Sequence, residues 1–135
     1  MEILITGGAG FIGSHILEQL NERPDVDVVV FDNLSSGSRD HVPARMELVE
    51  GDVCDEEAVD AVFADHHFDA VVHLAAQTMV PISVENPVLD CQINLEGVLH
   101  VLEACRTHGV PHILFSSSAA VYGDNLNIPL GETER

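Results

Sequence analysis

The eight residues TGGAGFIG at positions 6–13 limit the fold of this chain more than any other stretch. They connect the apolar run EILIT, which predicts a buried strand over 2–6, to a segment with helical periodicity over 11–22. Glycines at such a junction let a pyrophosphate approach the helix N-terminus, where free N–H groups attract anions. The stretch therefore predicts a dinucleotide-binding turn. Two fingerprints fit it: G-x-G-x-x-G through Gly8, Gly10 and Gly13, and G-x-x-G-x-x-G through Gly7, Gly10 and Gly13.

Strand and helix patterns alternate along the rest of the chain. This rhythm predicts βαβ units and an α/β fold, a doubly wound parallel sheet (Rossmann fold) of about five strands. We expect one dinucleotide-binding domain over residues 1–135. The predicted strands are 2–6, 27–31, 46–52, 68–76 and 112–118, and the predicted helices are 11–22, 55–66 and 86–108.

The charge balance excludes several classes of partner. The chain has 23 acidic residues and five arginines but no lysine, and its formal net charge is −18. Such acidity argues against nucleic acid or an anionic membrane as a partner, and no apolar run is long enough to span a bilayer. Because the N-terminus has no signal-peptide pattern, we expect a cytoplasmic protein. The acidity fits either a high-salt cytoplasm or an ordinary acidic protein.

No metal site is predicted. The cysteines, Cys54, Cys91 and Cys105, are odd in number and never at CxxC spacing, so we expect reduced, mostly buried thiols. His66 and His67 are adjacent, so on a helix they would diverge by about 100° and share one ion poorly.

A carboxylate at the end of the second predicted strand indicates which dinucleotide is bound. Asp32 follows Gly13 by 19 residues, the spacing at which an acidic side chain accepts hydrogen bonds from the adenosine ribose. The same charge would repel the 2′-phosphate of NADP. NAD is therefore the predicted cofactor, and Arg39 is the one residue nearby that argues for NADP.

The predicted helix 86–108 has two apolar sides. One side is a heptad-like seam, and the other carries small and β-branched residues. A helix that is apolar on two sides is buried on two sides, so we expect it to pack on the sheet and against a partner subunit. The seam is Val88, Cys91, Leu95, Val98, Leu102 and Cys105, and the second side is Ile93, Gly97, Val101 and Ala104.

Five motifs occur in a fixed order: TGGAGFIG, FDN, GDV, HLAA and SSSAAVYG. With them the whole chain resembles the extended short-chain dehydrogenase/reductase family, most closely its NAD-dependent sugar-nucleotide epimerases of the UDP-glucose 4-epimerase type. The resemblance selects the glycine register Gly7, Gly10 and Gly13. It also implies a nucleotide-sugar substrate and a homodimer formed through the helix 86–108.

The resemblance further implies a set of cofactor-binding residues. Backbone amides at Phe11 and Ile12 would bind the pyrophosphate. The adenosine ribose would be held by Asp32 and Asn33 beside the loop Ser35, Ser36 and Gly37. The adenine would be flanked by Asp52 and Val53, with the carboxylate accepting from its amino group. The middle of the cofactor would be lined by Leu74, Ala75 and Ala76, and Asn94 would steady the active-site backbone.

The resemblance assigns a catalytic role to Ser118, which would hydrogen-bond the sugar 4-oxygen during hydride transfer. Related dehydratases carry an Asp-Glu pair directly after this serine, where this chain has Ala119 and Ala120. Epimerisation or simple oxidoreduction is therefore favoured over dehydration. Tyr122 matches a structural residue of the family.

The family's Tyr-x-x-x-Lys base motif is not found in these 135 residues, which contain no lysine. We therefore expect the N-terminal portion of a longer enzyme or a truncated gene product, inactive on its own. Two hypotheses stay open. One is the cofactor half of an NAD-dependent nucleotide-sugar 4-epimerase, or of a related oxidoreductase or decarboxylase. The other is a stand-alone NAD-binding module without catalysis.

Overall fold

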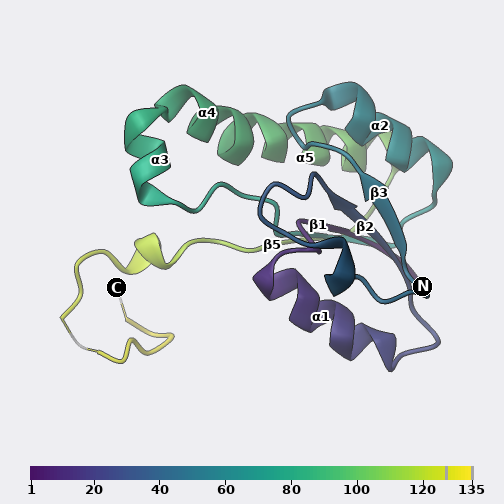
Figure 1. Cartoon of the computed structure of the whole chain (residues 1–135), viewed down its shortest axis with the longest axis horizontal. Helices are drawn as coiled ribbons and strands as arrows, with labels where there is room; N and C mark the ends of the chain where they lie inside the picture. Colours follow the sequence, from purple (N-terminus) through teal and green to yellow (C-terminus); the bar gives the residue numbers. More distant parts are fainter. Residues whose placement is uncertain (127, 135) are drawn as a thin grey trace.

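A computed structural model describes residues 1–126 and 128–134, which form a parallel sheet with helices on both faces (Figure 1). The five-stranded sheet has the order β3-β2-β1-β4-β5. Its strands are β1 Glu2–Thr6, β2 Asp27–Asp32, β3 Glu47–Glu50, β4 Ala70–His73 and β5 Ile113–Phe115. The α-helices are α1 Phe11–Asn21, α2 Glu56–Asp65, α3 Val80–Glu85, α4 Pro87–Cys91 and α5 Gly97–His108. The predicted doubly wound fold is confirmed.

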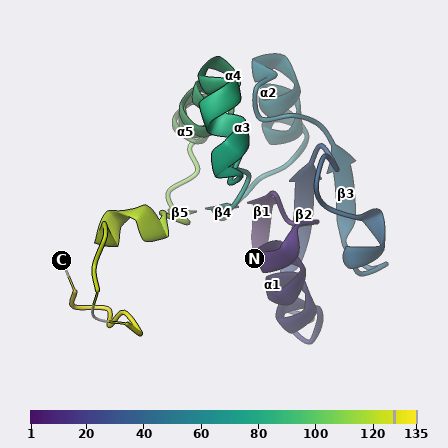
Figure 2. The same ribbon diagram turned by 60° about the vertical axis from the view of Figure 1, so that its left-hand side comes forward.

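The helices cover the two faces of the sheet unequally. Figure 2 shows α1 on one face, with α2, α4 and α5 on the other. On the α1 side, Ile5 and Val30 pack with Leu17, and on the other side Leu4 and Val71 pack with Val101. Because the central strands are covered on both faces, they are continuous apolar runs and not alternating ones.

The strand order reverses at β1, which pairs with β2 on one side and with β4 on the other. Thr6 at the end of β1 lies beside Phe31 of β2 and beside His73 of β4. The carboxyl end of β1 is therefore the point at which the strand order reverses, the position where doubly wound sheets bind ligands. The glycine turn 7–10 lies at this point.

The third, fourth and fifth strands are shorter than predicted, because the residues after Glu50, His73 and Phe115 leave the sheet at this same edge. The chain after β5 extends away from the sheet as a 3₁₀ turn, Ala119–Tyr122, and irregular backbone (Figure 1). Within the described residues, every helix is too short or too polar to cross a membrane.

The predicted helix 86–108 is interrupted. A π-helical turn, Gln92–Glu96, separates α4 from α5, and the separate short helix α3 precedes them. The side that packs on the sheet is the second one, where Gly97, Val101 and Ala104 are buried. Gly97 lets α5 approach the Val53 side chain, which a Cβ would meet at 2.7 Å.

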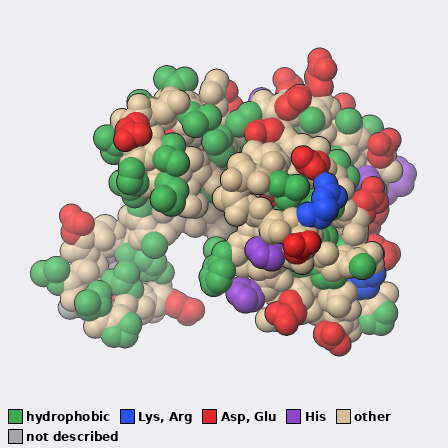
Figure 3. All heavy atoms as spheres, in the orientation of Figure 1, with side chains coloured by type: hydrophobic (Ala, Val, Ile, Leu, Met, Phe, Trp, Pro, Cys, Tyr) green, Lys and Arg blue, Asp and Glu red, His purple; other side chains and the backbone are tan. Residues whose placement is uncertain are grey.

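The seam itself is largely open to solvent. Leu95 is 62% exposed, Val88 and Leu102 are exposed as well, and only the last residue of the seam, Cys105, is buried. Leu99, beside the seam, is also exposed. Hydrophobic side chains gather over α3 and α4 in Figure 3. Cys91 also lies on this exposed side, so the prediction of mostly buried thiols holds for Cys105 and fails for Cys91.

Two substitutions on α5 test this assignment of faces. Val101→Ala removes buried methyl groups and leaves a cavity, so the free energy of unfolding falls by about 2 kcal/mol. Leu99→Ala, on the exposed side of the same helix, changes it by less than about 0.5 kcal/mol. Urea denaturation at low protein concentration measures both, and equal losses would contradict the assignment.

Candidate functional site

The glycine turn lies directly against the segment that follows β4. Gly7 has a φ of 70°, and its N–H donates to the Phe31 carbonyl oxygen over 2.9 Å. A Cβ at Gly7 would lie 2.5 Å from the Ala75 nitrogen, and one at Gly13 would lie 2.4 Å from the Gly8 oxygen. The turn therefore has no room for side chains at these positions. The same contacts bring the first turn of α1 close to the end of β4.

The N-terminus of α1 is open. Its N-cap is Gly10, which has no side chain to bond the first-turn N–H groups. These N–H groups, at Phe11, Ile12 and Gly13, lack partners within the helix, so they can donate hydrogen bonds to an anion. A Cβ at Gly10 would have only the Gly7 oxygen close to it, at 3.3 Å. The space in front of the helix is thus free for a phosphate group.

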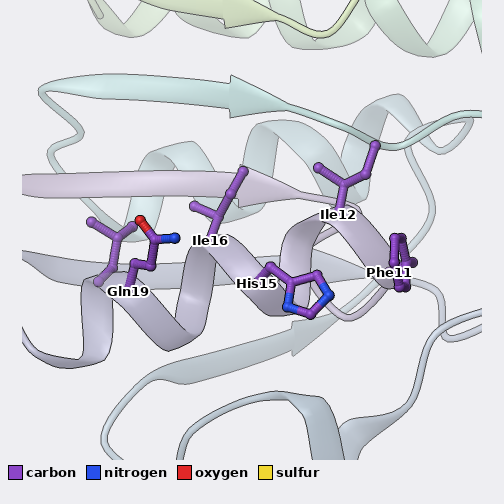
Figure 4. A pocket seen from close by; sticks show the side chains of 6 residues that line it. Phe11, Ile12, His15, Ile16 and Gln19 are labelled. Carbon is purple, nitrogen blue, oxygen red and sulfur yellow. The ribbon is translucent and has the colours of Figure 1, made fainter.

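The side chains of Phe11 and Ile12 do not contribute to this anion site. They point into a groove of about 320 Å³ on the outer face of α1, together with His15 and Ile16 (Figure 4). The Phe11 and His15 rings meet edge to face at a centroid distance of 5.0 Å. Only the backbone of the first turn can therefore bind a pyrophosphate.

Asp32 connects the glycine turn to the loop after β2. Its side chain is buried, and Oδ2 accepts the Ala9 N–H over 2.9 Å. Oδ1 accepts the Leu34 N–H over 2.8 Å, at a residue with a φ of 56°. Each carboxylate oxygen has a second lone pair. Asp32 can therefore hold both loops and still accept a hydrogen bond from a ribose hydroxyl.

The loop 33–41 closes over the glycine turn. The Ala9 oxygen accepts the Ser38 N–H over 3.1 Å and the His41 Nδ1–H over 2.8 Å. A Cβ at Gly37 would lie 2.7 Å from the Ala9 carbonyl carbon, so only glycine allows this approach. Ser35 and Ser36 stay exposed at the tip of the loop.

Asn33 and Asp52 form a second polar pair at the same edge. The Asn33 Nδ2 donates to Asp52 Oδ2 over 2.8 Å, and Asp52 Oδ1 accepts the Cys54 N–H over 2.9 Å. These hydrogen bonds lower the pKa of Asp52, although its partial burial acts in the opposite direction. Val53 is buried against α5, and its oxygen accepts the His100 Nδ1–H over 2.8 Å. Its side chain is therefore core, and only its backbone can face a base.

Thr6 and His73 join the ends of β1 and β4 from inside the sheet. Both are fully buried, with Thr6 Oγ1 and His73 Nδ1 2.8 Å apart. Burial lowers the pKa of His73 to about 4, so the imidazole is neutral near pH 7. The Ala75 N–H also donates to Thr6 Oγ1, over 3.4 Å. The pair is thus hydrogen-bonded to the segment just after β4, which contains Leu74, Ala75 and Ala76. Sequence reasoning did not identify this pair.

Asn94 binds the backbone just beyond these residues. Its Oδ1 accepts the Gln77 N–H over 2.9 Å, and its Nδ2 donates to the Gln77 oxygen over 3.0 Å. The Gln77 side chain and Asn94 both donate to Asp90 Oδ1. Asn94 lies in the π-helical turn, a feature common at functional sites, and it steadies the backbone expected to line the cofactor.

Ser118 lies three residues beyond β5, in the segment that extends away from the sheet (Figures 1 and 2). Its Oγ accepts the Ala120 N–H over 3.1 Å and caps the 3₁₀ turn, and the side chain is exposed. In this structure Ser118 is the N-cap of the turn Ala119–Tyr122. Within the described residues, no group of three or more His, Cys, Asp or Glu side chains is arranged to hold a metal ion.

Comparisons with known proteins identify this arrangement. The profile of the NAD dependent epimerase/dehydratase family matches residues 3–135. The chain belongs to this family. It is 43% identical over 130 residues to the UDP-glucose 4-epimerase of Azospirillum brasilense, covering 96% of this chain and 37% of that protein.

Solved structures of epimerases have the same fold. The chain is 46% identical, with a TM-score of 0.88, to a Thermus thermophilus UDP-glucose 4-epimerase in complex with NAD, covering 100% of this chain and 42% of that one. It is 37% identical, with a TM-score of 0.83, to a UDP-N-acetylglucosamine 4-epimerase from Methanobrevibacter ruminantium, covering 98% and 43%. The chain thus spans about two fifths of the length of these relatives.

Family membership confirms the predicted resemblance, the fold class and NAD as the cofactor of the family. The site of this chain fits such a group in three ways: a turn that excludes Cβ atoms, an uncapped helix N-terminus and a buried carboxylate at the end of β2. The roles of the single residues stay predictions.

The close approach of Gly7 to β4 can be tested with a matched pair of glycines. Gly7→Ala lowers the free energy of unfolding by more than about 3 kcal/mol, because a strained backbone and overpacking act together. Gly109 has a similar φ, 73°, but nothing within 4 Å of its Cβ position. Gly109→Ala therefore costs only about 1 kcal/mol. Urea denaturation measures both, and similar losses would show that the contact with Ala75 is unimportant.

Proposed function

We propose that this chain is the NAD-binding portion of a nucleotide-sugar 4-epimerase of the UDP-glucose/UDP-galactose type. The observation that carries the proposal is the buried Asp32 carboxylate, which joins the glycine turn to the loop after β2 within an epimerase fold. Bound NAD would accept a hydride from the sugar and return it, and the protein would hold cofactor and sugar in register.

Each part of the site has a proposed task. The first-turn N–H groups of α1 bind the pyrophosphate, and Asp32 accepts from the adenosine ribose, with Asn33 and Ser35 beside it. Asp52 accepts from the adenine amino group, and its hydrogen bonds keep it ionised. The segment 74–76 lines the middle of the cofactor, held by the Thr6–His73 pair and by Asn94.

Ser118 is proposed to hydrogen-bond the sugar 4-oxygen. Its hydroxyl is exposed. Because β5 is parallel to β4, the segment that carries Ser118 leaves the sheet at the same edge as the other site residues. Ala119 and Ala120 offer no acid or base, which supports epimerisation or oxidoreduction over dehydration. A related oxidoreductase or decarboxylase uses the same cofactor half and stays an alternative.

We propose further that the 135 residues alone do not catalyse epimerisation. They contain no lysine, and their relatives are more than twice as long. Purified chain with NAD and UDP-galactose is expected to form no UDP-glucose, measured in a coupled assay with a full-length epimerase as positive control. Turnover would support a complete catalyst in place of a cofactor module.

Cofactor choice tests the role of Asp32. The chain is expected to bind NAD more tightly than NADP, measured by isothermal titration calorimetry. Asp32→Asn is expected to weaken NAD binding at least about tenfold, because it removes a charge-assisted hydrogen bond. Asp40→Asn, the same change at an exposed position of the same loop, should leave the affinity within about twofold. Tighter binding of NADP by the unaltered chain would contradict the proposal.

We also propose that two copies pair through an exposed apolar surface formed by α4, the π-helical turn and α5. The apolar side chains there are Val88, Leu95, Leu99 and Leu102, and they lie opposite the face that packs on the sheet. A dimer of twice 14.6 kDa is expected by sedimentation equilibrium in moderate salt. Leu99→Glu should leave a monomer, whereas His15→Glu, in the α1 groove, should not. A monomeric unaltered chain would contradict this interface.

A further inference from the structure

The cation that argued for NADP is already paired in this structure. Arg39 begins the 3₁₀ turn Arg39–His41, in the loop that is tied to Ala9 of the glycine turn. Its guanidinium Nη2 lies 2.8 Å from Glu50 Oε2. The side chain is therefore directed to the end of β3.

Glu50 lies directly beside Asp32. The two are register partners at the carboxyl ends of β3 and β2, so their backbones are about 4.8 Å apart. Asp32 is buried and bound to backbone N–H groups, whereas the Glu50 side chain is 58% exposed. Glu50 is thus a second carboxylate at the edge where the adenosine ribose is proposed to bind. It pairs with Arg39 of the loop after β2.

Among the described residues between β2 and β3, no other arginine is placed to replace Arg39. Arg45, the other arginine between β2 and β3, donates to Asn21 Oδ1 and to backbone oxygens of Leu20 and Val26. These residues lie at the end of α1 and the start of β2, the opposite edge of the sheet. Acidic side chains are spread over the face shown in Figure 3, and basic ones are sparse.

A phosphate on the ribose 2′-oxygen would need a guanidinium partner and would be repelled by nearby carboxylates. The Glu50–Arg39 pair removes the partner, and the Glu50 charge adds to the repulsion from Asp32. We infer that Glu50 is a specificity-determining residue, which selects NAD over NADP by keeping Arg39 away from the 2′-position. This inference rests on the proposed NAD site at Asp32.

The pair suits a direct test, because an exposed ion pair adds little to stability and its removal leaves the fold intact. The test variants are Glu50→Gln, Arg39→Met and the double variant. Glu47→Gln is the matched control, since Glu47 is an exposed glutamate at the other end of β3. Dissociation constants for NAD and NADP are measured for each chain by calorimetry at low and at high salt.

Glu50→Gln is expected to strengthen NADP binding about tenfold and to change NAD binding less than twofold, because the freed guanidinium can bond the 2′-phosphate. In the Arg39→Met background the same change should give less than about threefold, the part due to lost repulsion alone. The gain should shrink at high salt, since the groups are exposed. Glu47→Gln should shift neither constant by more than about twofold.

Three results would overturn the inference: no gain in NADP affinity in Glu50→Gln, an equal gain without Arg39, or the same gain in Glu47→Gln. In each of these cases binding of NAD by the unaltered chain would still support the proposed function. If the unaltered chain binds neither dinucleotide, the proposed site fails, and the inference about Glu50 fails with it.

Discussion

The buried carboxylate of Asp32 is the interaction on which the proposed site depends. It accepts one backbone N–H from the glycine turn and one from the loop after β2, so two segments far apart in sequence share one anchor. A buried ionised group is costly unless it is hydrogen-bonded, and here both oxygens are satisfied by backbone donors. The same loop then returns to Ala9 through Ser38 and His41. The loop after β2 is thereby hydrogen-bonded to the glycine turn at the edge where the ribose is proposed to bind.

The side of the candidate site next to β4 is formed by close contact and not by charge. Gly7 and Ala75 are so near that no side chain fits between them, and the neutral Thr6–His73 pair joins the two strand ends beneath. Because His73 has a pKa of about 4, this support carries no charge near neutral pH and does not compete with Asp32 for the cofactor's groups. One wall of the site is thus acidic and polar, while the other is tight and uncharged.

Local patterns in the sequence were sufficient for the fold class and for naming candidate residues around the glycine turn, whose roles stay predictions. The glycine turn and the place of Asp32 at the end of the second strand follow from motifs within one βαβ unit, whereas the order of the strands was not predicted. Contacts between distant segments were missed, such as Thr6 with His73 and Arg39 with Glu50, since nothing in their local spacing reveals them. Which apolar side of the helix 86–108 packs on the sheet could not be predicted, because a heptad-like seam looks the same whether a sheet or a partner covers it. In the structure, Gly97 lets the second side of the helix approach Val53, and that side is the one that is buried.

Charge and apolar surface act in opposite directions on the association of this chain. Two copies of net charge −18 repel each other at low ionic strength, while the exposed apolar surface around Leu95 and Leu99 favours pairing. Salt screens the repulsion over about 8 Å at physiological ionic strength but does not weaken burial of apolar area. Ionic strength is therefore expected to shift the balance between monomer and dimer if the proposed pairing occurs. The same screening weakens the exposed Arg39–Glu50 pair, so salt acts both on the proposed interface and, independently, on the edge where the ribose is proposed to bind.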